Sequence, residues 1–204
     1  ITGALLAGAA TLTQAANDYS LVPDEFIYCT TCHGVELRGN VSVDAPRLNG
    51  MEGWYLKNQM LAFKKGQRGT HPEDLIGMEM QPQAAALSEE QIEDVVAFAT
   101  ALPVRTSTIE HTISGDAARG ETLYASCGAC HGTHGEGNKM MNAPALAGQS
   151  DWYLVRQLDK YRSGARGYDP ADTRGQQMKA ATAVLTQAED VRDVVAYINS
   201  LATN

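Results

Sequence analysis

Two short stretches of the chain carry the same pattern of thiols and imidazole. "CTTCH" occupies residues 29–33 and "CGACH" occupies residues 127–131, so each has two cysteines three positions apart and a histidine directly after the second. Side chains at i and i+3 are neighbours on a helical turn. Cys29 and Cys32 can therefore form thioethers with the two vinyl groups on one edge of a porphyrin, and His33 then faces the iron.

The second stretch offers the same groups as Cys127, Cys130 and His131, and these four cysteines are all that the chain contains. The spacing predicts two covalently bound haem c groups, one at each stretch. Two alternatives remain. The pairs can be redox-active thiols or disulfides of an exported chain, or they can be two knuckles of a zinc site. Neither alternative explains a histidine after both pairs.

A haem iron that is held by one histidine takes a second axial ligand, and methionine is the natural one. Met80 and Met178 match at an offset of 98 residues, each seven residues before the leucine that precedes the last helix. A thioether ligand favours ferrous iron and raises the reduction potential. Met78 is the competitor, but its register partner is Gln176, which cannot serve. The predicted iron ligands are His33, Met80, His131 and Met178.

Three further pairs of residues match in register and are predicted to surround the haems. A proline carbonyl can accept the ring N–H of the histidine and fix its tautomer; the alternative is a rigid turn. The tryptophan indole and the arginine guanidinium can bond a haem propionate; the alternatives are a core tryptophan and a solvated arginine. The pairs are Pro46 and Pro144, Trp54 and Trp152, and Arg68 and Arg166.

Most of the chain consists of two similar copies of one sequence unit. Residues 29–88 align with 127–186 without a gap, and one inserted residue then brings "DVVAF" onto "DVVAY". Such an internal repeat indicates a tandem duplication. The predicted organisation is an N-terminal segment at 1–17, a first domain at 18–101, a linker at 102–115 and a second domain at 116–204.

Each unit is predicted to hold three helices and no strand, so the fold class is all-α. The first helix carries the cysteine motif, the second has apolar residues at i, i+4 and i+7, and the third opens with a capping-box pair. The stripes are Leu56, Met60 and Phe63, and Leu154, Leu158 and Tyr161; the capping pairs are Ser88 with Gln91 and Thr186 with Glu189. The buried face of the third helix is predicted as Ile92, Val95, Val96 and Ala99, and as Val191, Val194, Val195 and Ile198.

Charge excludes one class of partner and suggests another. The net charge of -8 argues against nucleic acid, whose phosphates need a basic surface. Residues 1–105 hold 13 acids against 7 Lys and Arg, whereas residues 106–204 hold 11 against 9. One hypothesis is that the first unit docks the more basic redox partner through Glu73, Asp74 and Glu79. The alternative is a solvated acidic face.

The chain starts with the uncharged, mostly apolar "ITGALLAGAATL", followed by "TQA". This resembles the end of a secretory signal. Twelve residues are short for a span that needs about 20. The prediction is an exported protein that keeps residues 1–17 as a possible membrane attachment.

The repeated units resemble the dihaem cytochrome c4 family, from residue 18 to residue 204. Each reads Cys-x-x-Cys-His, then "AP.L.G", then Trp-Tyr, an aromatic-Gly-x-Arg-Gly turn, a methionine and a last helix. The resemblance implies two tandem class I cytochrome c domains related by pseudo-twofold symmetry, with both haems ligated by histidine and methionine. It also implies a periplasmic electron carrier, not an enzyme, between a quinol-oxidising cytochrome bc complex and a haem-copper terminal oxidase.

Two other functions stay open at this point. The chain can be a fixed electron-transfer subunit of a membrane or dehydrogenase complex. It can also be a catalytic dihaem enzyme, such as a peroxidase or a thiosulfate dehydrogenase. Catalysis at haem iron needs an open or labile sixth position, and a methionine is available at both sites, so this reading is disfavoured.

Overall fold

The described part of the chain, residues 22–104 and 111–201 of a computed structural model, is helical and contains no strand. Two isolated β-bridges, Asn40 with Ala45 and Asn138 with Ala143, repeat at the 98-residue offset. The predicted all-α class is confirmed. Within the two described ranges, no helix combines the length and apolar character that a membrane crossing requires. The segment predicted at residues 1–17 lies outside the described residues.

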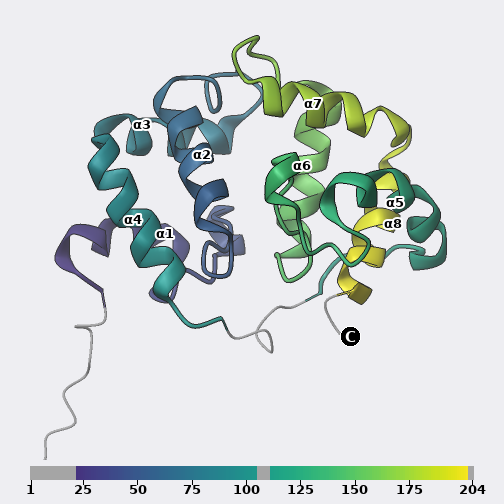
Figure 1. Cartoon of the computed structure of the whole chain (residues 1–204), viewed down its shortest axis with the longest axis horizontal. Coiled ribbons are helices and arrows are strands. Elements are labelled where there is room, and N and C mark those ends of the chain that lie inside the picture. Colours follow the sequence, from purple (N-terminus) through teal and green to yellow (C-terminus); the bar gives the residue numbers. More distant parts are fainter. Residues whose placement is uncertain (1–21, 105–110, 202–204) are drawn as a thin grey trace, which may run out of the picture.

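The helices form two groups that lie side by side, with α2 and α6 on the sides that face each other (Figure 1). The first group is α1 (Ile27–His33), α2 (Gly53–Lys64), α3 (Leu75–Ala86) and α4 (Glu89–Ala101). The second is α5 (Ala117–His131), α6 (Asp151–Ser163), α7 (Thr173–Ala181) and α8 (Ala188–Leu201). Short 3-10 turns are η2 (Asp24–Phe26), η3 (Val41–Val43), η5 (Lys139–Met141) and η6 (Thr182–Val184).

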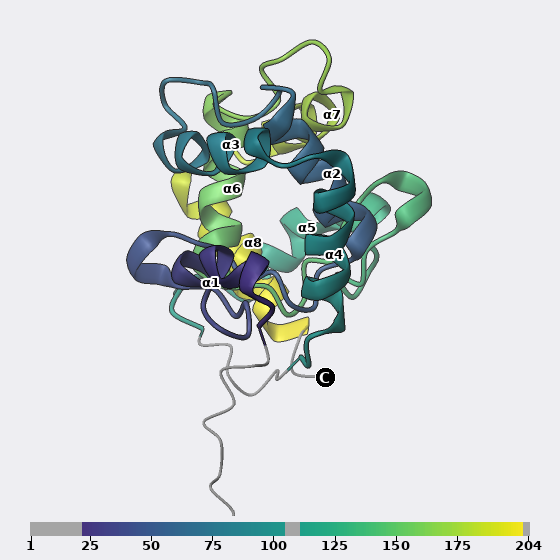
Figure 2. The same ribbon diagram turned by 90° about the vertical axis from the view of Figure 1, so that its left-hand side faces the viewer.

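Each group has a fourth helix that the sequence analysis did not predict. These helices, α3 and α7, carry Met80 and Met178, and both lie at the same end of the molecule (Figures 1 and 2). Each begins after an aspartate that caps it, the preferred kind of residue for that position. Asp74 accepts the backbone N–H of Gly77 at 3.0 Å, and Asp172 accepts that of Gly175 at 2.9 Å.

One of the two predicted capping boxes is correct. Ser88 and Gln91 form both reciprocal hydrogen bonds at the start of α4. The pair Thr186 and Glu189 is wrong, because the residue inserted before α8 shifts the start of that helix by one position. There Asp190 accepts the backbone N–H of Gln187 at 2.8 Å and the hydroxyl of Thr186 at 3.3 Å.

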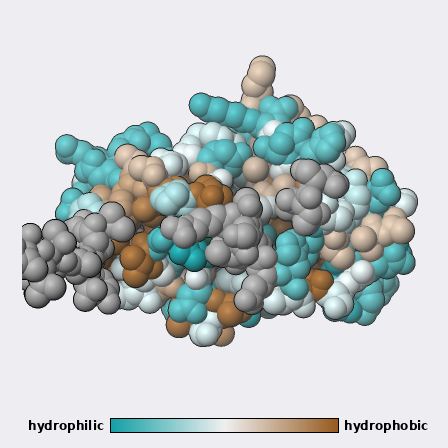
Figure 3. Space-filling model, turned by 90° about the horizontal axis from the view of Figure 1, so that it is seen from below, coloured by the Kyte–Doolittle hydropathy of each residue, from teal (hydrophilic) through white to brown (hydrophobic). Residues whose placement is uncertain are grey.

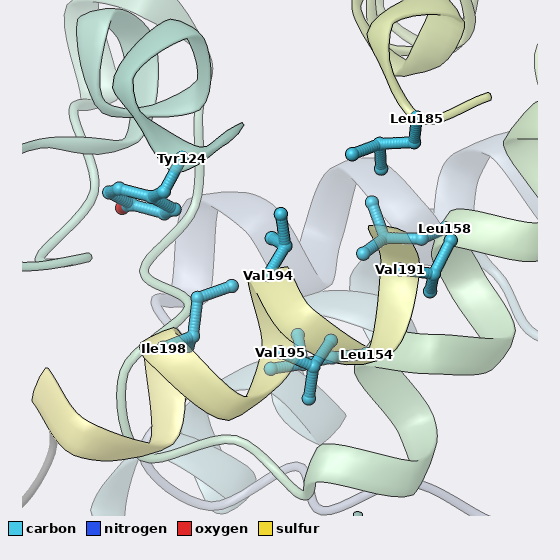
Figure 4. Close-up of a cluster of buried hydrophobic side chains, with 8 residues drawn as sticks. All are labelled: Tyr124, Leu154, Leu158, Leu185, Val191, Val194, Val195 and Ile198. Carbon is cyan, nitrogen blue, oxygen red and sulfur yellow. The ribbon is translucent and has the colours of Figure 1, made fainter. Parts of the chain in front are cut away.

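The predicted buried faces of the last helices are confirmed at seven of their eight positions. In the second domain the four predicted residues of α8 are at most 2% exposed and pack against α5 and α6 (Figure 4). Burying such side chains stabilises a fold by roughly 1.5 to 3 kcal/mol each. The first-domain cluster is smaller, and Val95 is only half-buried there. Its buried members are Leu37, Leu56, Ile92, Val96 and Ala99.

A reciprocal set of hydrogen bonds joins the two domains. Arg68 donates to Gln59 of its own domain at 2.7 Å and to Gln157 of the other domain at 3.1 Å. Arg166 donates to Gln157 at 2.8 Å and across to Gln59 at 2.9 Å. This exchange is what a pseudo-twofold arrangement produces. The reading of these arginines as solvated is wrong, because they are 8% and 4% exposed.

The two described ends of the predicted linker are tied to different domains. The carbonyl of Pro103 accepts the side-chain N–H of Asn49 at 3.2 Å. On the far side, buried Asp151 accepts the backbone N–H groups of Thr112 and Ile113, the latter at 2.8 Å. Asp151 therefore fixes the chain as it enters the second domain.

Replacing Asp151 with alanine is expected to destabilise the second domain by about 3 kcal/mol, because two backbone N–H groups lose a charged acceptor. The change would appear as a lower urea midpoint, followed by helix circular dichroism. Glu121, an exposed acid of α5, is the control. A loss for Asp151→Ala no larger than for Glu121→Ala would contradict this role.

Candidate functional site

The two motif histidines sit in matching environments at the ends of α1 and α5. His33 and His131 are each 7% exposed. Nδ1 of His33 lies 2.8 Å from the carbonyl oxygen of Pro46, and Nδ1 of His131 lies 2.7 Å from that of Pro144. The predicted hydrogen bond between histidine and proline is therefore present in both domains.

This hydrogen bond fixes the chemistry of the ring. A carbonyl only accepts, so Nδ1 carries the proton and Nε2 keeps a lone pair for a metal. Burial lowers the pKa of His33 and His131, although the proline hydrogen bonds act in the opposite direction. Both rings are thus held neutral, which is the form that binds iron.

The cysteines lie in the same two helices, α1 and α5, and form no disulfide with one another. Burial raises the pKa of Cys29 and Cys127. Redox-active Cys-x-x-Cys pairs have a lowered thiol pKa, so this environment disfavours the redox reading. In the two described ranges, no three His, Cys, Asp or Glu side chains lie where they could hold a metal ion together. A zinc site has no ligand set in that part of the chain.

A cavity of about 200 Å³ in the second domain brings the predicted residues together. Cys127, Cys130, His131 and Met178 all line it, and much of the remaining wall is apolar. The apolar lining includes Leu158, Leu185, Val194 and Ile198. Two thiols, a neutral imidazole and a thioether around one apolar space are the donor set that a covalently attached haem requires.

The first domain supplies part of the wall of this cavity. The start of α2 and the residues before it contribute Met51, Glu52, Trp54 and Tyr55. Trp54 is half-buried, and it faces the cavity of the other domain. A haem in the second domain would therefore meet side chains of both repeats.

In the first domain the two candidate methionines differ in exposure. Met78 is 45% exposed, whereas Met80 is partly buried. Met51 and Met60 pack against the hydrophobic core of that domain. The lower exposure of Met80 agrees with its choice over Met78, and Met80 as the iron ligand of the first domain stays a prediction.

Arg68 retains one unused donor. Its Nε is buried and has no hydrogen-bond partner among the described residues. The guanidinium lies 4.4 Å from the centre of the Phe63 ring, and Arg166 lies 4.3 Å from that of Tyr161. An unpaired buried guanidinium N–H suits a carboxylate, and the propionate role of Arg68 stays a prediction.

Three residues of the interface were misplaced or missed by the sequence analysis. Asp74 was assigned to a docking surface, but it is 0% exposed and forms an ion pair with Lys160 of the other domain. Glu73 and Glu79 remain exposed. Gln59 and Gln157 were missed, although their match in register was a signal.

Seen from below, apolar residues gather mainly over the first-domain side of the surface (Figure 3).

Comparison with known proteins identifies the repeats. The sequence profile described as "Cytochrome c" matches residues 25–102 and again residues 117–202. The "Thiosulfate dehydrogenase electron acceptor" of Stutzerimonas stutzeri (strain A1501) is 37% identical over 156 residues, covering 72% of this chain and 68% of that protein. "Cytochrome c4" of Azotobacter vinelandii is 29% identical over an alignment of 213 positions, covering 98% of this chain and 97% of that protein.

Two solved structures have a similar fold. Reduced recombinant cytochrome c4 from Pseudomonas stutzeri superposes with a TM-score of 0.65 at 26% identity, covering 85% of this chain and 93% of that one. Thiosulfate dehydrogenase (TsdBA) from Marichromatium purpuratum also has a TM-score of 0.65, at 31% identity, and covers 83% of this chain but only 35% of that one.

Proposed function

The chain belongs to the cytochrome c family, as a dihaem member of the c4 type, and we propose that it carries electrons from a quinol-oxidising cytochrome bc complex to a haem-copper terminal oxidase. It is an electron carrier with two covalently bound haem c groups. The proposed compartment is the periplasm. Attachment to the membrane through residues 1–17 stays a prediction, which fractionation of cells would test.

The observation that carries the proposal is the set of groups around the cavity of the second domain. Cys127 and Cys130 would hold the haem covalently, while His131 and Met178 would be the ligands of its iron. The haem supplies an iron that exchanges one electron between Fe(III) and Fe(II). The protein keeps both ligands in place in each state and excludes water with the apolar wall, which keeps rearrangement small.

Close packing of the domains supports transfer within the chain. Arg68 and Arg166 reach across to the glutamines of the opposite α6 and α2. The wall of the cavity in the second domain also includes residues of α2. An electron that enters through one domain can therefore leave through the other, and the two partner proteins need not compete for one surface.

A second candidate is supported by particular relatives. Proteins named as thiosulfate dehydrogenase electron acceptors are 37% and 29% identical to this chain, and a thiosulfate dehydrogenase structure contains a region of the same fold. The chain would then accept electrons from a dehydrogenase, and the oxidase would remain the acceptor. The two candidates differ only in the donor.

The donor can be identified with the purified, oxidised protein. Reduction is followed in the alpha band after mixing with quinol and membranes that contain the bc complex, and separately with thiosulfate and its dehydrogenase. We expect fast reduction in the first mixture that bc inhibitors stop, and rapid reoxidation by oxidase membranes. Fast reduction in the second mixture alone would support the dehydrogenase role, and reduction in neither would exclude both donors.

A further inference from the structure

A carboxylate of the first domain reaches the histidine loop of the second. Glu52 directly precedes α2, and its Oε1 accepts the backbone N–H of Ala145 at 2.9 Å. The contact is partly buried, and Glu52 lines the cavity of the second domain. Partial burial reduces screening by water, so its charge acts more strongly than a surface charge would.

The peptide that Glu52 contacts is the one that holds His131. The N–H of Ala145 and the C=O of Pro144 belong to one amide group, and that carbonyl accepts the ring N–H of His131 at 2.7 Å. Hydrogen bonds in a chain polarise one another. A carboxylate on the N–H side makes the carbonyl a stronger acceptor, which in turn makes the imidazole more basic.

The repeat gives the first domain no counterpart of this carboxylate in register. Its histidine makes the same hydrogen bond, from His33 to Pro46 at 2.8 Å. At the register position of Glu52, however, the second domain has Ser150, which carries no charge. At the position of Ala145, the first domain has the cation Arg47. A carboxylate therefore contacts the Pro144 peptide, whereas the residue that follows Pro46 in the chain carries a positive charge.

We propose that Glu52 is a positioning residue for His131, which acts through the Pro144–Ala145 peptide and lowers the reduction potential of the second haem. The proposal rests on the proposed function in one respect, namely that His131 binds iron. A more basic imidazole donates more electron density and stabilises Fe(III) over Fe(II). The contact between domains then sets the potential of the second haem, and a chain whose domains part would lose this effect.

The test is Glu52→Gln, because the amide keeps an oxygen for the N–H of Ala145 and removes the charge. At a fixed potential near its midpoint, the ratio of reduced to oxidised second haem is expected to rise by about three- to tenfold, where tenfold is 59 mV for one electron. The first haem is expected to keep its midpoint. Each haem is followed separately through its hyperfine-shifted methyl resonances in an NMR redox titration.

Two further variants separate charge from tethering. Glu90→Gln removes an exposed carboxylate of the same domain and serves as the control. Glu52→Ala removes both charge and acceptor, so its midpoint should shift at least as far as that of Glu52→Gln. An unchanged second haem in both Glu52 variants, or an equal shift of both haems, would overturn the proposal. If His131 does not bind iron, the spectrum of the unmodified protein would lack a six-coordinate second haem, which is a different result from an unchanged midpoint in the variants.

Discussion

Replacing Met178 with alanine is expected to lower the reduction potential of the second haem by at least on the order of 100 mV, within the ~0.8 V that axial ligands span. The thioether favours Fe(II), so its loss favours Fe(III). The vacated position should also let the reduced protein bind carbon monoxide rapidly. Met178 lines the same cavity as His131 and packs against the core of its domain. We therefore expect the change to act on the iron site directly.

The chain offers a matched control in each domain. Met140 is 93% exposed, and its replacement should leave the potential unchanged. In the first domain, Met80→Ala should reproduce the Met178 result, whereas Met78→Ala should not. Potentiometry with carbon monoxide difference spectra measures both effects. Carbon monoxide binding by the unmodified protein, or an unaltered potential in Met178→Ala, would rule out methionine as the ligand.

Sequence reasoning reached the repeat, the helix faces and the haem motif because each has a local signature. The helices that bear the methionines were missed since their apolar spacing is weak: α3 reads "LIGMEMQPQAAA" with Pro82 inside it, and α7 reads "TRGQQMKAA". Their aspartate caps hold them instead. An aspartate three residues before a glycine in both repeats, at Asp74 and Asp172, was the available signal.

Contacts between the domains could not be predicted from the sequence, for a different reason. A repeat in register says that two copies share a fold, but it does not say which faces of the copies meet. The two residues of each contact are far apart along the chain, and neither contact has a matching pair in register. The contacts are Glu52 with Ala145 and Asp74 with Lys160. These asymmetric pairs are where two similar domains acquire different properties.

Replacing Lys160 with methionine is expected to destabilise the packing of the domains by roughly 3 to 5 kcal/mol. Asp74 is fully buried, and its Oδ1 accepts hydrogen bonds from the ammonium of Lys160 and from the backbone N–H of Gly77 in the first turn of α3. Without the lysine, a buried carboxylate keeps its desolvation cost and loses the ammonium with which it is ion-paired. Because Asp74 caps the helix of Met80, this loss should also loosen the first haem site.

The register provides the control for this ion pair. Asp172 caps α7 in the same way, but the position that matches Lys160 is Ala62. Asp74→Asn should therefore cost more than Asp172→Asn in thermal unfolding. In the Lys160→Met background, Asp74→Asn should restore part of the stability, since the uncompensated charge is gone. Equal effects of the two aspartate changes would show that Lys160 contributes nothing beyond capping.

The same ion pair predicts how stability depends on pH. Burial alone would raise the pKa of Asp74, but the hydrogen bond and charge of Lys160, together with the charge of Arg68 and the N–H of Gly77, outweigh it and hold the pKa below its usual value. A lowered pKa gives stability that is present at neutral pH and is lost as the pH falls through the folded-state value. The gap in unfolding midpoint between the unmodified protein and Lys160→Met should therefore be widest near pH 7 and narrow in acid. A gap that is constant with pH would assign the effect of Lys160 to the packing of its methylene stem rather than to its charge.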